Sequence, residues 1–212
     1  MTQEQRDHLQ DLSEIRNLMQ RSSRFISLSG LSGISVGICA LIGAAVAYWF
    51  VDGNVNEYYV AGQLFSRGGA NYPLLTFIAI DGALILFSAI AFGIFFTTRK
   101  ARKDGLKVWD LSSQRLLINL AIPLVAGGLL CLIMLYHGTI GYVPPMTLLF
   151  YGMALINASK YTLNDIRYLG LLEILLGLLS AVFLGYGFYF WVLGFGILHI
   201  VYGTVMYFKY ER

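Results

Sequence analysis

Three ionisable side chains lie inside long apolar stretches of this 212-residue chain, and they are the residues best placed to do chemistry: Asp81, Glu173 and His199. A charge at the centre of a bilayer costs at least about 2.5 to 3.5 kcal/mol, so such residues normally face the interior of a helix bundle and mark a pathway, a relay or a ligand contact. Groups that load and release a proton at depth are what a proton-coupled carrier uses.

Each of the three also has a purely structural explanation. Asp81 would then hydrogen-bond to a serine or to a backbone carbonyl, and Glu173, only five residues from Tyr168, would extend to the inner interface. A histidine such as His199 often joins two helices by a hydrogen bond. At 1.5 Å per residue the three lie at different depths, so we expect no shared metal site.

Three further residues are lesser candidates for lining a cavity. A proline within a helix frees a backbone carbonyl, and asparagine side chains offer polar groups at depth. A simple kink is the competing explanation for the proline. These candidates are Asn119, Pro123 and Asn157.

Enzyme signatures are absent from the sequence. It contains no HExxH, GxSxG, Walker loop, CxxC or dinucleotide fingerprint. The two cysteines, Cys39 and Cys131, fall in apolar stretches and lack the close Cys or His neighbours of a zinc site. We therefore expect no catalysis and no cofactor.

Composition indicates the elements that hold these side chains. Hydrophobic residues make up 57% of the chain and charged residues 13%, so lipid must be the solvent for most of it. A membrane-spanning helix needs roughly 20 apolar residues, and the sequence predicts an all-α, polytopic protein with six transmembrane helices. We place them at 26–51, 73–98, 115–136, 142–158, 168–187 and 189–208.

The distribution of basic residues predicts the orientation, because cytoplasmic loops retain lysine and arginine. All of them except Arg67 fall on the side of the two termini, which we therefore expect to be cytoplasmic. Because the basic residues are spread over several short loops, with no patch interleaved with exposed aromatic rings, we expect no nucleic-acid partner.

The segments outside the six-helix domain, 25–208, are short. Residues 1–24 repeat apolar side chains at helical spacing opposite an acidic face, which predicts a cytoplasmic amphipathic helix, and residues 209–212 form a cytoplasmic tail. The helix would pack against the inner loops or the membrane, or would bind a soluble partner or a second copy of the chain. Gly33 and Gly37 favour close helix packing within the bundle, with dimerisation as the alternative.

One internal similarity has opposed topology. Residues 81–96 (DGALILFSAIAFGIFF) align with 173–188 (EILLGLLSAVFLGYGF), acid on acid. The second span runs inward and the fifth outward, so the halves 25–137 and 142–208 would be inverted repeats, as in many secondary transporters. Chance similarity between apolar segments is the competing explanation.

The segment RSSRFISLSGLSG, at 21–33, together with the six-span layout, resembles a group of bacterial integral membrane proteins of similar length whose activity is uncharacterised. The resemblance implies a bacterial inner membrane and no particular activity.

Two functions follow from these observations. The first is a small carrier, coupled to protons, for an unidentified small molecule or ion, with Asp81, Glu173 and His199 along its path. The second is a sensor or scaffold that does not transport and that binds a soluble partner through the N-terminal helix and the basic loop at 99–115.

Overall fold

The computed structural model describes residues 25, 28–51, 53, 72–137 and 139–212, and every regular element among them is a helix. The predicted helix at residues 1–24 lies outside this part of the chain. The longer helices are α2 (Gly30–Phe50), α4 (Tyr72–Lys103), α5 (Leu111–Tyr136), α6 (Val143–Ala158) and α7 (Asp165–Val182). The last stretch contains α8 (Gly187–Trp191), the π-helical segment η5 (Val192–Leu198) and α9 (His199–Tyr210). Short 3-10 turns are η2 (Ile140–Tyr142), η3 (Ser159–Tyr161) and η4 (Leu184–Tyr186).

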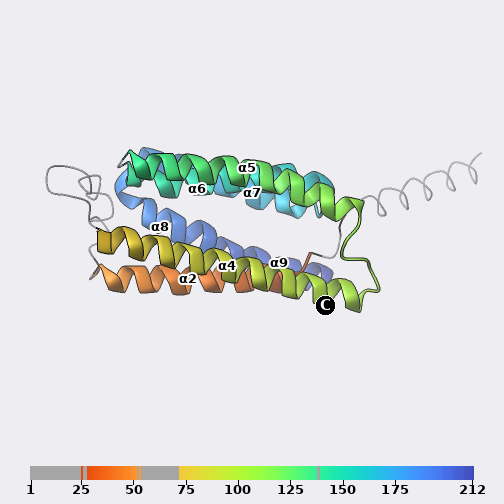
Figure 1. Cartoon of the computed structure of the whole chain (residues 1–212). Helices are drawn as coiled ribbons and strands as arrows, with labels where there is room; N and C mark the ends of the chain where they lie inside the picture. Colours follow the sequence, from red (N-terminus) through yellow and green to blue (C-terminus); the bar gives the residue numbers. More distant parts are fainter. Residues whose placement is uncertain (1–24, 26–27, 52, 54–71, 138) are drawn as a thin grey trace, which may run out of the picture.

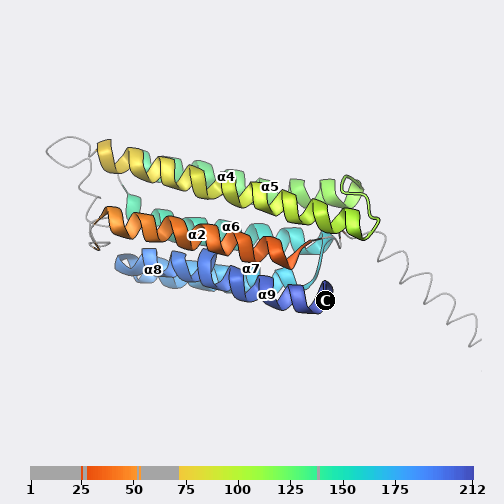
Figure 2. The ribbon, with the colours of Figure 1, turned by 90° about the horizontal axis from the view of Figure 1, so that it is seen from below.

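The helices form two layers of roughly parallel axes. In one layer α2 packs between α4 and α9; in the other α6 packs between α5 and α7. Seen from below, the first layer lies in front of the second (Figure 2). The segment from α8 through η5 crosses between the layers, since it contacts α2 on one side and α6 and α7 on the other. The two layers are therefore joined chiefly through this last helical stretch (Figure 1).

Glycines allow the closest helix contacts within each layer. A Cβ added at Gly152 of α6 would lie 2.6 Å from the carbonyl oxygen of Gly170 in α7. A Cβ at Gly37 of α2 would lie 2.7 Å from the carbonyl oxygen of Gly196, and one at Gly33 would lie 3.1 Å from the Cα of Gly203. Gly33 and Gly37 thus pack within the bundle, in agreement with the expectation of close packing there.

Among the described residues, five helical stretches are long and apolar enough to cross a membrane. They are Gly30–Phe50, Thr76–Lys103, Leu111–Tyr136, Ile140–Tyr161 and Leu184–Tyr210. The fourth is longer than predicted, because η2 and η3 extend α6 at its two ends. Helix α7 has 18 residues, three of them charged. It ends at Val182, earlier than predicted, because the chain turns through η4. The number of spans and the inverted repeat remain predictions.

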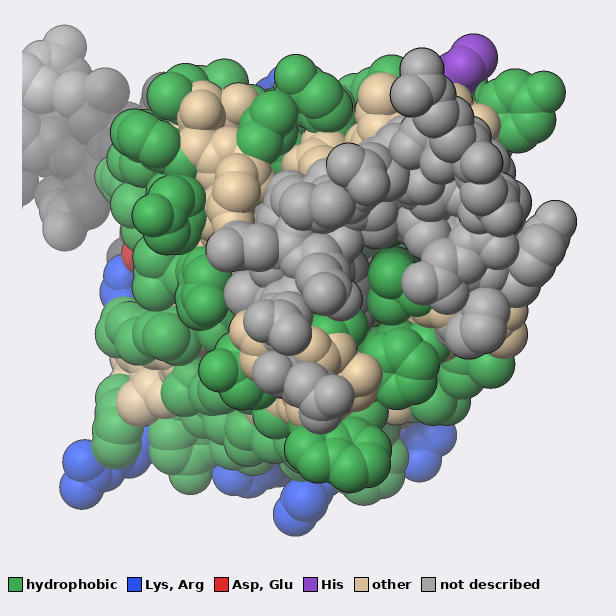
Figure 3. Space-filling view, turned by 90° about the vertical axis from the view of Figure 1, so that its left-hand side faces the viewer, with side chains coloured by type: hydrophobic (Ala, Val, Ile, Leu, Met, Phe, Trp, Pro, Cys, Tyr) green, Lys and Arg blue, Asp and Glu red, His purple; other side chains and the backbone are tan. Residues whose placement is uncertain are grey.

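The described basic residues lie at one end of the bundle. Helices α4, α6 and α9 finish there, and α2, α5 and α7 begin there (Figure 1). The opposite end is mainly hydrophobic where it is described, and in the view onto it lysine and arginine side chains are seen only around the outline of the molecule (Figure 3). The residues at the basic end are Arg99, Lys100, Arg102, Lys103, Lys107, Arg115, Lys160, Arg167, Lys209 and Arg212.

The end of the chain caps its first described helix. The carboxylate of Glu211 accepts hydrogen bonds from the backbone N–H of Gly30 and, at 3.2 Å, from the hydroxyl of Ser29. Lys100, in the last turn of α4, lies 3.8 Å from the same carboxylate and donates to the carbonyl of Leu28 at 2.9 Å. A carboxylate at a helix N-terminus satisfies free N–H groups and complements the helix dipole, so Glu211 ties α2 to α4 and α9.

We predict that Glu211→Ala lowers the free energy of unfolding by about 1 to 3 kcal/mol, because it removes a charge-assisted cap from α2. Glu211→Gln should recover part of this loss, since its amide oxygen still accepts a hydrogen bond. Thermal unfolding of the purified protein in detergent measures both effects. Arg212→Ala, on the next residue, is the control, and an equal loss there would contradict the prediction.

Candidate functional site

The side chain of Glu173 lies in the contact between the layers, where α7 meets η5. It is fully buried, on the face of α7 that also buries Leu169, Gly170, Gly177 and Ser180. The spacing of three, four and seven residues along this face is that of one side of an α-helix. The helix therefore directs an acidic side chain into a surface of otherwise small or apolar residues.

His199 joins Glu173 from α9. Its Nδ1 lies 2.9 Å from the carbonyl oxygen of Gly194 and 3.5 Å from Oε1 of Glu173. Its Nε2 lies 2.7 Å from the hydroxyl of Tyr151 in α6. A carbonyl only accepts, so in the neutral imidazole Nδ1 carries the hydrogen and Nε2 accepts from Tyr151. Three elements therefore fix the ring that faces the acid.

The π-helical segment η5 creates the space for the carboxyl group. Gly194 and Gly196 are buried within it. A Cβ at Gly194 would lie 2.6 Å from Oε2 of Glu173 and 2.5 Å from Leu148, so no side chain fits between the helix and the acid. Single π-helical turns are rare and occur often at functional sites. Here the turn places the backbone of Gly194 against the carboxyl group of Glu173. It also places the carbonyl oxygen of Gly194 within hydrogen-bond distance of His199.

Neither carboxyl oxygen of Glu173 has a hydrogen-bond partner among the described residues, and the same holds for the hydroxyl of Ser180. The contact with His199, at 3.5 Å, is too long for a good hydrogen bond, and it is an ion pair only when the imidazole is protonated and the carboxyl group ionised. Leaving a buried polar group unpaired costs about 1 to 3 kcal/mol, and more for a charge. Such groups in a native core call for a reason beyond packing, and exchange of a proton or a cation supplies one.

The structure brings together two of the three predicted path residues. Counting from Tyr168 puts Glu173 at a shallower depth than His199, but α7 begins at Asp165, so Glu173 lies eight residues into its helix, about 12 Å from its start. The estimate of different depths was therefore wrong for this pair. Asp81, in α4, is partly buried beside α2, where a Cβ at Gly43 would lie 3.5 Å from its Oδ1. No described contact joins Asp81 to Glu173 or His199.

The lesser candidates form a structural contact between α5 and α6. Pro123 has no N–H to offer the carbonyl of Asn119, four residues earlier. The side chain of Asn157 donates to that carbonyl at 3.1 Å, while the side chain of Asn119 bonds back to the carbonyl of Arg115 at 2.8 Å. The expectation that Pro123 frees a carbonyl is thus met, and the group it frees is paired with Asn157.

Sequence reasoning missed Tyr151, Gly194 and Ser180. Tyr151 could have been identified from the sequence, since it lies in the middle of a predicted span instead of at an interface and its hydroxyl group needs a hydrogen-bond partner there. Nothing in the sequence distinguishes Gly194 and Ser180, because glycine and serine are common in packed membrane helices. In the part of the chain that the structure describes, no three His, Cys, Asp or Glu side chains gather as a metal site would require.

Comparisons of the chain with protein-family models, with curated proteins and with solved structures gave no match.

We predict that Asn157→Ala destabilises the bundle by about 1 to 3 kcal/mol, because the carbonyl freed by Pro123 loses its partner. In a Pro123→Ala background the restored backbone N–H pairs with this carbonyl, so the same change should cost at least about 1 kcal/mol less. Thermal unfolding of the wild-type protein, the two single variants and the double variant gives the coupling free energy between Asn157 and Pro123. Strict additivity would show that Asn157 does not compensate for the proline.

We predict that Gly194→Ala destabilises the protein by about 1 to 3 kcal/mol, because the new methyl group overlaps both the side chain of Leu148 and Oε2 of Glu173. The loss should be smaller in a Glu173→Ala background. Gly93 in α4 has open space around it, so Gly93→Ala is the matched control and should be neutral or stabilising. Thermal unfolding in detergent measures the stability of both variants. Equal changes in stability in Gly194→Ala and Gly93→Ala would contradict the close contact between the Glu173 carboxyl group and Gly194.

Proposed function

We propose that this chain is a small proton-coupled membrane carrier in which Glu173 binds and releases the coupling proton and His199, held by Tyr151, stands beside it. The observation that carries the proposal is the fully buried carboxyl group of Glu173, without a hydrogen-bond partner among the described residues and 3.5 Å from His199. Six spans, cytoplasmic termini and a bacterial inner membrane are part of the same proposal.

The electrostatics of the site favour proton exchange over a permanent ion pair. Among the ion pairs of the described residues, the partner within reach of Glu173 is His199, whereas Lys100 and Lys209 pair with other acids at the basic end of the bundle. An ionised carboxylate in this core needs a compensating positive charge. A proton on either Glu173 or His199 supplies it, so the pair can hold a proton without a fixed cation.

The position of the pair offers a way to link proton binding to movement. Glu173 belongs to the layer of α5, α6 and α7, and it touches Gly194 in the segment that crosses to the other layer. A change of charge on Glu173 therefore acts where the two layers are joined. Alternating access in carriers is largely the rocking of one group of helices against another around such a fixed site.

One observation favours the second function, a sensor or scaffold. The connection between α4 and α5, together with the helix residues at its two ends, exposes apolar side chains next to basic ones: Leu106, Trp109 and Leu111 are exposed, as are Lys103 and Lys107. Such a combination suits a soluble partner at the cytoplasmic face. The N-terminal helix that would share this role lies outside the described residues, and the buried Glu173 has no part in it, so we place this function second.

Glu173→Gln keeps the shape of the side chain and removes its titrating proton, so it should abolish proton-linked flux. Proteoliposomes that enclose a pH-sensitive dye can be challenged with pooled small solutes. The proposal predicts that at least one pool shifts the internal pH with the wild-type protein and none does with Glu173→Gln.

Asp81→Asn is the matched comparison for this experiment, since it makes the same change on α4. Flux that survives in Asp81→Asn and is lost in Glu173→Gln supports a site confined to Glu173 and His199. Loss of flux in both folded variants extends the path to Asp81. An unchanged response in Glu173→Gln, or no response of the wild-type protein to any pool, overturns the proposal.

A further inference from the structure

The connection between α4 and α5, residues 104–110, is a fixed turn at the basic end of the bundle (Figure 1). Gly105 has a φ of +66°, in the left-handed region that favours glycine, and its N–H donates to the carbonyl of Arg102 at 3.2 Å. The N–H of Leu106 donates to the carbonyl of Ala101 at 2.8 Å. These two bonds are the Schellman motif that closes a helix, and a capping box begins α5 at the other end of the turn. Both ends of the connection are therefore held by hydrogen bonds.

Large apolar side chains and basic side chains are exposed together on this turn. Leu106, Trp109 and Leu111 are 41%, 66% and 71% exposed. Lys103 and Lys107 are exposed as well, and neither is within ion-pair distance of an acid among the described residues. A chain spans at most about 3.6 Å per residue, so the α-carbons of the two lysines lie within about 15 Å of each other. We call these five residues the α4–α5 surface.

The charge around the α4–α5 surface is positive. Asp104 is the exposed acid of the segment 99–115. The other acid, Asp110, is partly buried, and its carboxylate accepts the N–H of Ser113 at 2.7 Å. The exposed bases of the segment are Arg99, Arg102, Lys103, Lys107 and Arg115. The bases therefore outnumber the acids, and this part of the molecule attracts anions.

The position of the turn along the helices puts it at the level of lipid head groups. On α4 the exposed apolar side chains continue to Ile94 and Phe95, and Arg99 follows one turn later. A bilayer of about 40 to 45 Å contains a hydrocarbon core of about 30 Å, which leaves roughly 5 to 8 Å of head groups on each side. Lys103 lies four residues beyond Arg99, about 6 Å along the helix. With Arg99 at the edge of the hydrocarbon, Lys103 and the turn after it lie in the head-group layer.

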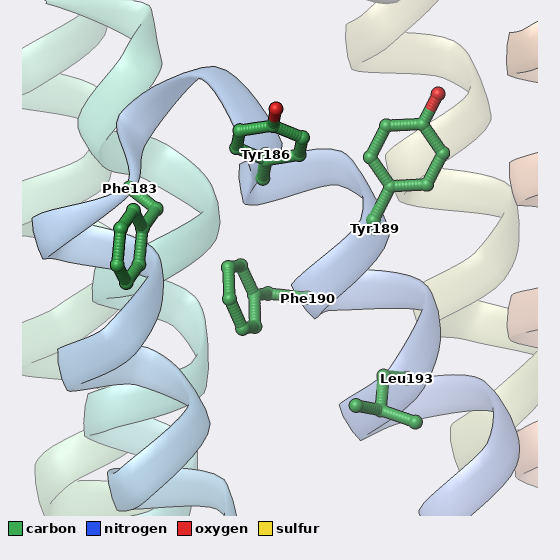
Figure 4. A pocket seen from close by; sticks show the side chains of 5 residues that line it. All are labelled: Phe183, Tyr186, Tyr189, Phe190 and Leu193. Carbon is green, nitrogen blue, oxygen red and sulfur yellow. The ribbon is translucent and has the colours of Figure 1, made fainter.

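The opposite end of the bundle has aromatic side chains without such charge. A surface pocket of about 210 Å³ there is lined by Phe183, Tyr186, Tyr189, Phe190 and Leu193. The hydroxyl groups of its two tyrosines point toward the same end of the bundle (Figure 4). Aromatic rings favour both interfaces of a membrane, so they do not distinguish one lipid from another by charge. The lysines of the α4–α5 surface add that distinction at the basic end.

The chemistry of the α4–α5 surface selects its occupant. A zwitterionic head group has no net charge for the lysines, and free phosphate would leave the tryptophan and the two leucines in water. A soluble protein would have to displace lipid head groups from this level before it covered the leucines. An anionic phospholipid supplies a phosphate for the lysines, an interface for the tryptophan and hydrocarbon for the leucines.

We propose that the α4–α5 surface binds an anionic phospholipid, with its lysines at the phosphate and its tryptophan and leucines against the glycerol and the upper acyl chains. Each lysine near such a lipid strengthens the attraction roughly fivefold. Helix α4 belongs to one layer and α5 to the other, so the lipid binds where the chain passes between the layers. The inference goes beyond the proton site at Glu173 and does not rest on it.

Quenching of tryptophan fluorescence by brominated lipid tests this proposal. The chain has three tryptophans, and Trp49→Phe with Trp191→Phe leaves Trp109 alone. Trp109→Phe with Trp191→Phe leaves Trp49, which is 78% exposed and lies at the opposite end of the bundle. Each full-length protein is reconstituted into phosphatidylcholine that contains a minor fraction of lipid brominated in its upper acyl chains, either phosphatidylglycerol or phosphatidylcholine.

The expected result is a charge preference at one tryptophan and not at the other. Brominated phosphatidylglycerol should be enriched at Trp109 at least roughly fivefold over brominated phosphatidylcholine, and less at high salt. At Trp49 the two brominated lipids should quench equally. Glycerol 3-phosphate, which has the phosphate without the chains, should not relieve the quenching of Trp109.

Two matched pairs of substitutions, made in the protein that retains Trp109, locate the charge. Lys103→Gln with Lys107→Gln should remove the preference for phosphatidylglycerol. Arg167→Gln with Arg212→Gln removes the same charge from α7 and from the end of the chain, so this variant should keep the preference. All four side chains are exposed, so neither pair of substitutions disturbs the core.

Several results would overturn the proposal. Equal quenching of Trp109 by both brominated lipids would mean that the surface lies at the interface without selecting charge. A preference that survives the two lysine substitutions, or that is lost equally in the arginine pair, would assign the attraction to the whole basic end. Relief by glycerol 3-phosphate would indicate a site for free phosphate. If acrylamide quenches Trp109 and brominated lipid does not, the surface lies in water and a soluble partner replaces the lipid.

Discussion

The contact between the carboxyl group of Glu173 and the backbone at Gly194 is the constraint on which the rest of this bundle depends. Four elements meet there: α7 supplies the acid, η5 the glycine, α9 the imidazole of His199 and α6 the hydroxyl of Tyr151. Any side chain at Gly194 would separate the two layers at the place where they are joined. The packing of the fold and the chemistry of the site are therefore set by the same few atoms.

Hydropathy was sufficient to predict that the chain is all-helical and roughly where its long helices lie. Runs of apolar residues separated by charged or turn-forming segments identify these helices, but they miss the capping box of Asp110 and Ser113 at which α5 begins, ahead of the predicted start at residue 115. The backbone conformation of the last helical stretch, from α8 to α9, could not be predicted from hydropathy. Its apolar run indicates a helix, but the change to a π-helical turn at 192–198 follows from how Gly194 and Gly196 pack against Glu173 and Leu41, far away in the chain.

The candidate site was predictable in its residue types and not in its pairing. The cost of an acid at depth identifies Asp81 and Glu173 equally well, because the argument uses only their position in an apolar run. What separates them is the neighbouring helix: α7 is packed against α6 and η5, whereas α4 packs along α2 at the edge of its layer. The pairing of Asn157 with the carbonyl of Asn119, 38 residues apart, is likewise a property of the packed helices.

The cap on α2 has a consequence for the order of events during synthesis. Gly30 and Glu211 are 181 residues apart, and the free N–H group at the start of α2 is satisfied by the carboxylate of that distant residue. A ribosome makes α2 long before it makes residue 211, so the N-terminus of α2 lacks this cap while every later helix is synthesised. Closure of the basic end of the bundle is thus a late step in folding, and a chain that stops before residue 211 would leave α2 without its cap.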